Sequence, residues 1–225
     1  MKVTIKHPAP APPFVVIVDD DSMFRRSITR LLEEHGHSVA PYESLDQLVE
    51  TGNIPKLGCA LLDLNLPSVG GLEIQKRLAA LAPTLAIVFL TGFGKVDSSV
   101  RAMKSGAVDF LQKPVDDVVL LQAVELAIDR SKTLNHQRAE RDELRGRFER
   151  LSTREREVFA LITSGLLNKQ AAAELDVTEK TIKFHRAHIM KKMEARSLAE
   201  LAKMAERIHL SDQLVSPPSG VPNPG

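Results

Sequence analysis

The chain has 225 residues, of which 43% are hydrophobic and 26% charged, as in an ordinary globular protein with one large domain or two of modest size. A single cysteine, Cys59, excludes an intramolecular disulfide, and no apolar run is long enough for a signal peptide or membrane span, so a cytoplasmic protein without membrane contact is expected. The formal net charge of +1 conceals −5 over residues 14–130 and +3 over residues 152–208, which predicts different partners for the two halves.

Strands and helices alternate along the first half of the chain. Prolines interrupt residues 1–13, which are expected to form a disordered arm. Short apolar strands are expected at residues 14–18, 38–42, 59–62, 86–90 and 108–111. Helices are expected at residues 22–35, 44–50, 71–81, 96–105 and 116–130. Five such pairs predict an α/β domain at residues 14–130, a doubly wound five-stranded parallel sheet with helices on both faces.

The second half contains only helical patterns. Residues 131–150 are highly polar but keep apolar residues at helical spacing, which predicts a helical linker. A small all-α domain is expected at residues 151–209, followed at residues 210–225 by a disordered tail with four prolines.

Acidic side chains follow two of the predicted strands. Asp19, Asp20 and Asp21 come directly after the first strand, and Asp63 comes after the third. The carboxyl ends of parallel strands share one edge of the sheet, so these carboxylates are expected to meet there. Crowded negative charges are unfavourable without a cation, and oxygen-only ligands suit Mg²⁺. The pattern therefore predicts a magnesium site that handles phosphate.

Two further strand ends support this interpretation. Lys113 follows the fifth strand and offers an ammonium, and Thr91 ends the fourth strand and offers a hydroxyl to a phosphoryl oxygen. Three aspartates after a strand are, taken alone, more often a solvated turn or a helix cap. The order of all these residues together favours the phosphate site.

Four sequence runs resemble the receiver domains of bacterial response regulators. They are residues 17–21 (IVDDD), 62–67 (LDLNLP), 89–92 (FLTG) and 109–114 (DFLQKP). The resemblance covers residues 14–130 and implies that Asp63 is the phosphoacceptor for a sensor histidine kinase. It also implies that Asp19, Asp20, Asp63 and the main-chain carbonyl of Asn65 hold Mg²⁺.

The same resemblance implies a conformational switch. Thr91 is drawn towards the new phosphoryl group, Lys113 pairs with that group, and Phe110 changes rotamer. The Lys113–Pro114 bond is cis in many members of this family, and the sequence leaves the isomer open.

The all-α half contains a helix-turn-helix pattern. A capping box within residues 151–157, in which Ser152 or Thr153 is followed by a glutamate, starts one helix, which Gly165 ends. A helix at residues 168–175, a turn at 176–178 and a helix at 179–193 follow. The last of these helices carries five cations with no acid between them, as expected for a helix that faces phosphates.

This half resembles the NarL/FixJ family of regulators with a LuxR-type helix-turn-helix. The shared runs are residues 151–158 (LSTREREV), 168–170 (NKQ) and 177–186 (VTEKTIKFHR), and residues 195–199 (ARSLA) favour the FixJ branch. The resemblance implies that base edges are read by Lys183, Phe184 and Ala187, with a shift towards Arg186. The residues implied to lie nearer phosphates are Lys180, Thr181, His188, Lys191 and Lys192. Asp176 replaces the usual turn glycine, and the helix at residues 197–208 is implied to mediate dimerisation.

The sequence thus predicts a phosphorylation-dependent, DNA-binding transcriptional regulator. Its expected partners are a sensor histidine kinase, double-stranded DNA, a second copy when phosphorylated and, as a candidate, RNA polymerase. A protein-interaction switch without DNA binding remains an alternative. An aspartyl-phosphate hydrolase is a weaker alternative, because such enzymes typically carry a second aspartate two residues after the nucleophile, where this chain has Asn65. No turnover is expected beyond hydrolysis of the chain's own acyl phosphate.

Overall fold

The computed structural model describes residues 14–66, 71–92 and 108–215. The chain divides into two compact units after residue 136. The helix predicted at residues 96–105 lies outside the described residues.

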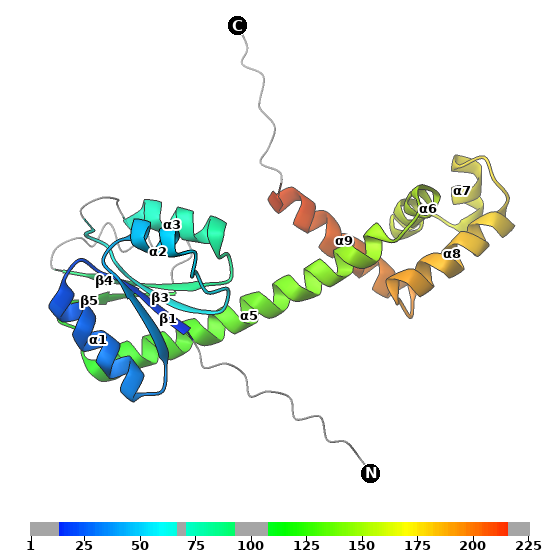
Figure 1. Cartoon of the computed structure of the whole chain (residues 1–225). Coiled ribbons are helices and arrows are strands. Elements are labelled where there is room, and N and C mark those ends of the chain that lie inside the picture. Colours follow the sequence, from blue (N-terminus) through cyan, green and yellow to red (C-terminus); the bar gives the residue numbers. More distant parts are fainter. Residues whose placement is uncertain (1–13, 67–70, 93–107, 216–225) are drawn as a thin grey trace, which may run out of the picture. The chain divides into compact units, whose positions relative to one another are not determined.

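The first unit is built on a five-stranded parallel sheet (Figure 1). Its strands are β1 (Phe14–Val18), β2 (Ser38–Tyr42), β3 (Gly58–Asp63), β4 (Ala86–Thr91) and β5 (Asp109–Gln112). They lie in the order β2-β1-β3-β4-β5, and every neighbouring pair is parallel. The strand order reverses between β1 and β3, and ligands of such sheets bind at that point, outside the carboxyl ends of the strands.

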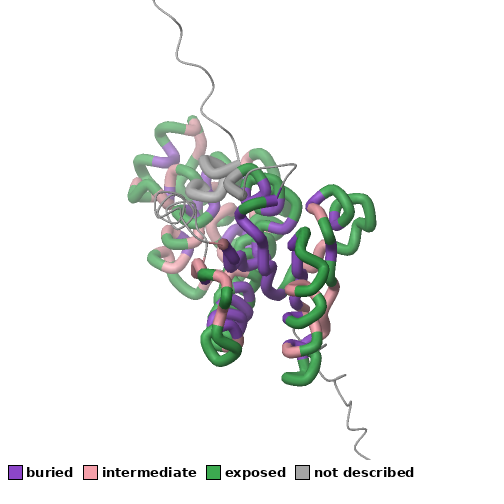
Figure 2. The backbone as a smooth tube through the Cα atoms, turned by 90° about the vertical axis from the view of Figure 1, so that its left-hand side faces the viewer, coloured by how far each residue is buried: buried purple, intermediate pink, exposed green. Residues whose placement is uncertain are grey.

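Helices cover both faces of this sheet, as predicted. They are α1 (Ser22–Glu34), α2 (Leu45–Thr51), α3 (Gly71–Leu81) and α5 (Asp117–Glu149). Because strand side chains alternate, Val15 and Ile17 share a core with α1 and α5, whereas Val16 and Val18 share another with α2 and α3. β3 and β4 are buried along their whole length (Figure 2). This burial explains why their sequences are continuously apolar.

Helix α5 runs without a break through the helix predicted at residues 116–130 and nearly all of the helical linker predicted at residues 131–150. Ser131, at the expected start of the linker, is fully buried. Its hydroxyl accepts a hydrogen bond from the Gly58 nitrogen (3.0 Å) and donates one to the Thr84 carbonyl (2.6 Å). The helix is therefore fixed to the amino-terminal edge of the sheet beyond residue 130.

The second unit is helical. It contains α6 (Thr153–Thr163), α7 (Asn168–Glu174), α8 (Glu179–Met193) and α9 (Leu198–Val215), together with the C-terminal part of α5. One core joins these helices, and Leu144 of α5 is buried in it with Ile182 and Ile189 of α8. Helix α9 extends past residue 210, where the tail was predicted to begin. Of the helices described in the two units, none is long and apolar enough to cross a membrane.

Local signals set the ends of these helices. Ser152 and Glu155 form the predicted capping box at the start of α6. Asp176, in the turn between α7 and α8, has a φ of 51°. This left-handed conformation is one that Asp tolerates better than most residues, so the expected helix-turn-helix forms without the usual glycine.

Candidate functional site

Three carboxylates predicted to form a site meet at the carboxyl edge of the sheet. Asp19 follows β1 and is 0% exposed, Asp63 ends β3 and is 6% exposed, and Asp20 is exposed. One oxygen of each lies within 4.8 Å of the others. The cluster lies beside the reversal of strand order, where this topology places ligands.

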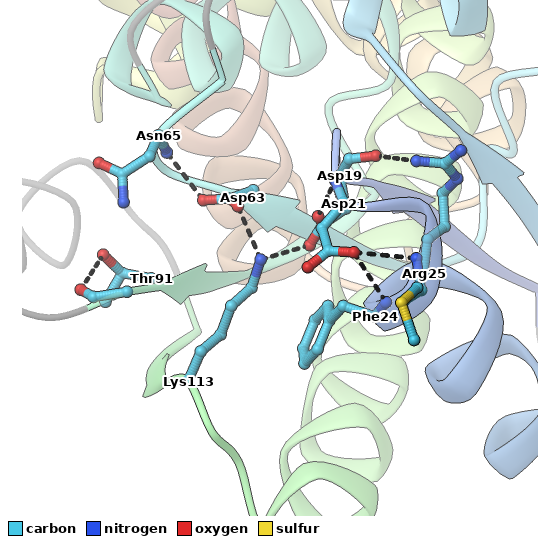
Figure 3. Close-up of polar contacts among 10 residues, drawn as sticks. Asp19, Asp21, Phe24, Arg25, Asp63, Asn65, Thr91 and Lys113 are labelled. Carbon is cyan, nitrogen blue, oxygen red and sulfur yellow. Dashed lines mark hydrogen bonds and ion pairs between the residues drawn. The ribbon is translucent and has the colours of Figure 1, made fainter.

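Lys113, which follows β5, neutralises part of this charge. Its Nζ donates to Oδ2 of Asp19 at 2.6 Å and to Oδ2 of Asp63 at 2.7 Å (Figure 3). The Lys113–Pro114 peptide bond, whose isomer the sequence left open, is cis.

Burial and ion pairing shift the pKa values of this cluster in opposite directions. Burial raises the pKa of Asp19, although the hydrogen bond and charge of Lys113 act in the opposite direction. For Lys113, burial alone would lower the pKa, but the hydrogen bonds to Asp19 and Asp63 leave it above its ordinary value. The ammonium therefore stays charged near neutral pH and serves as a counter-ion for the two carboxylates.

Backbone amides orient the outer oxygens of the same carboxylates. The Asn65 nitrogen donates to Oδ1 of Asp63 at 2.8 Å, and the Asp21 nitrogen donates to Oδ1 of Asp19 at 2.9 Å. Together with Lys113, these contacts fix the plane of each carboxylate.

The third aspartate of the run has a different role. Asp21 is the N-cap of α1, and its carboxylate accepts hydrogen bonds from the nitrogens of Met23 (2.9 Å) and Phe24 (3.1 Å). These backbone hydrogen bonds lower the pKa of Asp21. The run thus combines both interpretations of the sequence, because one aspartate caps a helix and the other two face Asp63.

The donor set fits a magnesium ion. Asp19, Asp20 and Asp63 offer only oxygen ligands, and the exposure of Asp20 leaves a side open to water. Mg²⁺ prefers one or two carboxylates plus several waters or phosphate oxygens.

The two residues predicted to switch lie on neighbouring strands. Thr91 ends β4, is 5% exposed, and its hydroxyl donates to the Gly92 carbonyl at 3.0 Å. Its own carbonyl accepts from the Lys113 nitrogen at 2.7 Å. Phe110, on β5, is half-buried against the core shared with α2 and α3.

Two residues of α1 contact the site without having been predicted. The Phe24 ring centroid lies 4.2 Å from Nζ of Lys113, and the guanidinium of Arg25 donates to the main-chain carbonyl of Asp19. An aromatic and a basic residue near the start of a helix carry no distinguishing sequence signal, because similar residues occur on most exposed helices.

A second candidate surface is the exposed side of α8. Thr178 caps this helix, and its hydroxyl accepts from the Thr181 nitrogen at 3.2 Å. Six of the residues predicted to contact nucleic acid are exposed: Lys180, Lys183, Phe184, Ala187, His188 and Lys191. The buried residues Ile182, Ile189 and Met193 occupy the opposite side. Helix α8 therefore presents a cationic face to solvent.

An aromatic residue stands within this cationic face. Phe184 is 60% exposed, and its ring centroid lies 4.3 Å from that of His188 in an edge-to-face arrangement. A large exposed aromatic side chain among cations is an arrangement suited to base edges and phosphates.

Two cations predicted to face nucleic acid have partners inside the unit. Arg186 is half-buried, and its guanidinium donates to Oδ1 of Asn168 at 3.2 Å. Lys192 forms an ion pair of 2.6 Å with Glu155, which is 4% exposed. Both side chains therefore hold α8 against the preceding helices.

Comparison with known families identifies a family for each half of the chain. Residues 15–125 match the family described as Response regulator receiver domain, and residues 149–205 match Bacterial regulatory proteins, luxR family.

Similar proteins match the chain over most of its length. The chain is 43% identical over 197 residues to Nodulation protein W of Bradyrhizobium diazoefficiens, covering 88% of this chain and 87% of that protein. It is 39% identical over 191 residues to the transcriptional regulatory protein FixJ of Azorhizobium caulinodans, covering 85% and 90%. Among solved structures, the response regulator StyR matches with a TM-score of 0.72 and 38% identity, covering 88% of this chain and 100% of that one. Full-length FixJ from B. japonicum matches with a TM-score of 0.53 and 35% identity, covering 88% and 98%.

Proposed function

Because the chain belongs to the DNA-binding transcriptional response regulators that join a receiver domain to a LuxR-type helix-turn-helix domain, we propose that Asp63 is its phosphoacceptor. The observation that carries this proposal is the contact of Lys113 with both Asp19 and Asp63 beside exposed Asp20. A nucleophilic carboxylate, a mobile ammonium and a cation-binding cluster are the groups that phosphoryl transfer to an aspartate requires.

The proposed reaction forms an acyl phosphate. A carboxylate oxygen of Asp63 attacks the phosphorus of a phosphohistidine on a sensor kinase, the new O–P bond forms, and the P–N bond breaks with its electron pair left on the imidazole. Lys113, already 2.7 Å from Asp63, pairs with an oxygen of the transferred group. Asp19, Asp20, Asp63 and the main-chain carbonyl of Asn65 would hold Mg²⁺, which neutralises charge on that group when bound.

The proposed switch starts from Thr91. Its hydroxyl turns from the Gly92 carbonyl towards a phosphoryl oxygen, and Phe110 changes rotamer to fill the space. The half-buried position of Phe110 supports this proposal, because a fully enclosed ring would have no room to turn.

For the DNA surface, the contacts of α8 refine the prediction. We propose that Lys183, Phe184 and Ala187 read base edges, while Lys180, Thr181, His188 and Lys191 lie near phosphates. The list of contacts predicted from sequence also contained Arg186 and Lys192. Because they contact Asn168 and Glu155, we propose that these two cations position the helix.

The remaining partners follow from the family. We propose a cytoplasmic protein that forms homodimers when phosphorylated, binds paired half-sites, and contacts RNA polymerase as a candidate partner. We propose no turnover beyond hydrolysis of its own acyl phosphate.

The test compares three full-length proteins before and after treatment with Mg²⁺ and a small phosphodonor. They are the wild type, Asp63→Asn, and the control Asp46→Asn, which changes an exposed aspartate that pairs with Arg77 on the neighbouring helix. Intact mass, oligomeric state and binding to selected genomic duplexes are measured. Wild type and control are expected to gain one phosphoryl group, dimerise and bind at least 10-fold more tightly, and Asp63→Asn to do none of these. Equal phosphorylation of Asp63→Asn would refute the assignment.

A further inference from the structure

A cationic pocket lies at the C-terminal end of α8. It encloses about 370 Å³ and is lined by Arg150, His188, Lys191, Lys192 and Glu194. Arg150 comes from the turn that follows α5, so the pocket joins the end of the linker segment to the helix proposed to enter the DNA groove. Family resemblance had not assigned Arg150 any role.

Two of the charges in this pocket are already neutralised. Glu194 forms an ion pair of 3.1 Å with Arg147, and Lys192 forms one of 2.6 Å with buried Glu155. Lys192 also donates to the main-chain carbonyl of Arg150 at 3.3 Å, which fixes the backbone of the turn. The pocket walls are therefore held in place by internal contacts.

The other two permanent charges remain available. Within the described part of the chain, the side chain of Arg150 makes a single hydrogen bond, from Nε to the Gly146 carbonyl at 3.3 Å, so its two terminal nitrogens remain available to a ligand. Across residues 14–66, 71–92 and 108–215, no carboxylate lies within ion-pair distance of Arg150 or Lys191. Both side chains are exposed, so the pocket presents an uncompensated positive charge to solvent.

The position of the pocket indicates which ligand it would bind. Lys180, Phe184, His188 and Lys191 follow one another at helical spacing along the exposed face of α8, and the pocket continues this face beyond the last of them. A duplex that contacts the face would bring its sugar-phosphate backbone to the pocket. A guanidinium offers planar paired donors that match two oxygens of one phosphate.

We propose that this pocket binds one backbone phosphate of the DNA duplex, with Arg150 and Lys191 as charged donors and the His188 ring as a further hydrogen-bonding group. The inference rests on the DNA binding proposed above and adds a contact from outside the helix-turn-helix. DNA binding would then fix the chain at the point where the linker segment enters the helical unit.

The test is the salt dependence of duplex binding by the full-length, phosphodonor-treated protein. Each phosphate contact contributes about −0.9 to the slope of log K against log salt concentration. Arg150→Gln is expected to make the slope less steep by about 1 and to weaken binding several-fold at low salt. Arg150→Lys keeps the charge and is expected to keep the slope.

Arg138→Gln is the matched control. It removes an equal charge from α5 where Arg138 faces Asp142 on the solvent side, so its slope should equal that of wild type. An unchanged slope in Arg150→Gln, with Lys183→Gln still weakening binding, would overturn the pocket but not the proposed function. Salt-insensitive binding by wild type, or no effect of Lys183→Gln, would overturn the proposed function itself. Thermal unfolding of each variant separates lost contacts from lost folding.

Discussion

Glu155 shows how one residue serves both local and long-range structure. Its carboxylate accepts from the Ser152 nitrogen at 2.7 Å as the capping box requires, and it pairs with Lys192 of α8 at 2.6 Å. Burial alone would raise the pKa of Glu155, but the contacts with Lys192 and Ser152 hold it below its ordinary value. The charged form therefore stabilises the helical unit.

We predict that Glu155→Gln lowers the free energy of unfolding of the helical unit by about 1–2 kcal/mol at pH 7, because the ion pair with Lys192 is lost. The loss is modest, since Lys192 is partly exposed and solvent screens the pair. A carboxyl with a lowered folded-state pKa contributes fully above its unfolded-state pKa and loses that contribution as the pH falls through its folded-state pKa. The difference between variant and wild type should thus shrink in acid. Amide hydrogen exchange of Ile182 and Ile189 measures the local stability.

Glu157→Gln provides the control for this prediction. Glu157 lies two residues further along α6 and pairs with Arg154 at the surface. Its substitution should change stability by less than about 0.5 kcal/mol. Equal losses in the two variants would mean that the contact with Lys192 is not what stabilises α8.

At the scale of elements, sequence predicted those features that depend on near neighbours. The strands could be predicted because each is a short apolar run of consecutive residues, and β1 and β3 are followed or ended by an aspartate. The parallel topology of the sheet then brings Asp19 close to Asp63. The ion pair between Lys192 and Glu155 could not be predicted in this way, since the residues are 37 positions apart and meet only because α6 packs on α8. The sequence of a charged helix shows how many cations it carries but not which of them form ion pairs with other elements.

The contact between α5 and the sheet was missed for a related reason. The polar residues after residue 130 predicted a helical linker, and nothing in them indicated that Ser131 satisfies two backbone groups inside the receiver. A serine hydroxyl that bonds to the backbone looks the same in sequence as one that bonds to water.

We predict that Ser131→Ala destabilises the receiver by about 1–3 kcal/mol, because the Gly58 nitrogen and the Thr84 carbonyl lose a buried partner. Thr133→Ala, two residues later, removes an exposed hydroxyl that bonds only to the Asp129 carbonyl of its own helix, and should have little effect. Urea unfolding followed by the reactivity of buried Cys59 with a thiol reagent reports on this unit, since burial raises the pKa of that thiol and keeps it unreactive. If Ser131→Ala unfolded at the wild-type urea concentration, the hydroxyl would not be anchoring the helix.

At the scale of the whole molecule, the second unit begins before the helix-turn-helix motif. Leu144 is buried in its core, and the ring centroid of Phe148 lies 5.2 Å from that of Phe159 in α6. The LuxR-family match begins at residue 149 and so leaves out these two contributions to the core.

We predict that a fragment of residues 137–225 is more stable than one of residues 150–225 by about 2–5 kcal/mol, the usual loss when large apolar side chains leave a core. Thermal and urea unfolding followed by circular dichroism would measure the difference. Leu144→Ala in the longer fragment should reproduce a large part of the loss, whereas Arg138→Gln should not. Identical stabilities would place the boundary of the unit at the family match instead.

The parallel sheet, buried on both faces, separates the positions that form the apolar cores from the positions that carry the charged groups of the site. The apolar residues of β3 and β4, residues 59–62 and 86–90, each belong to one of the two cores, so a polar substitution there would disturb a core. Asp19 and Lys113 lie just beyond the ends of β1 and β5 and belong to neither apolar core, so substitutions there remove an ion pair and leave the apolar packing of both cores in place. A substitution at a strand end would therefore alter the chemistry of the site while the scaffold that presents it stays intact.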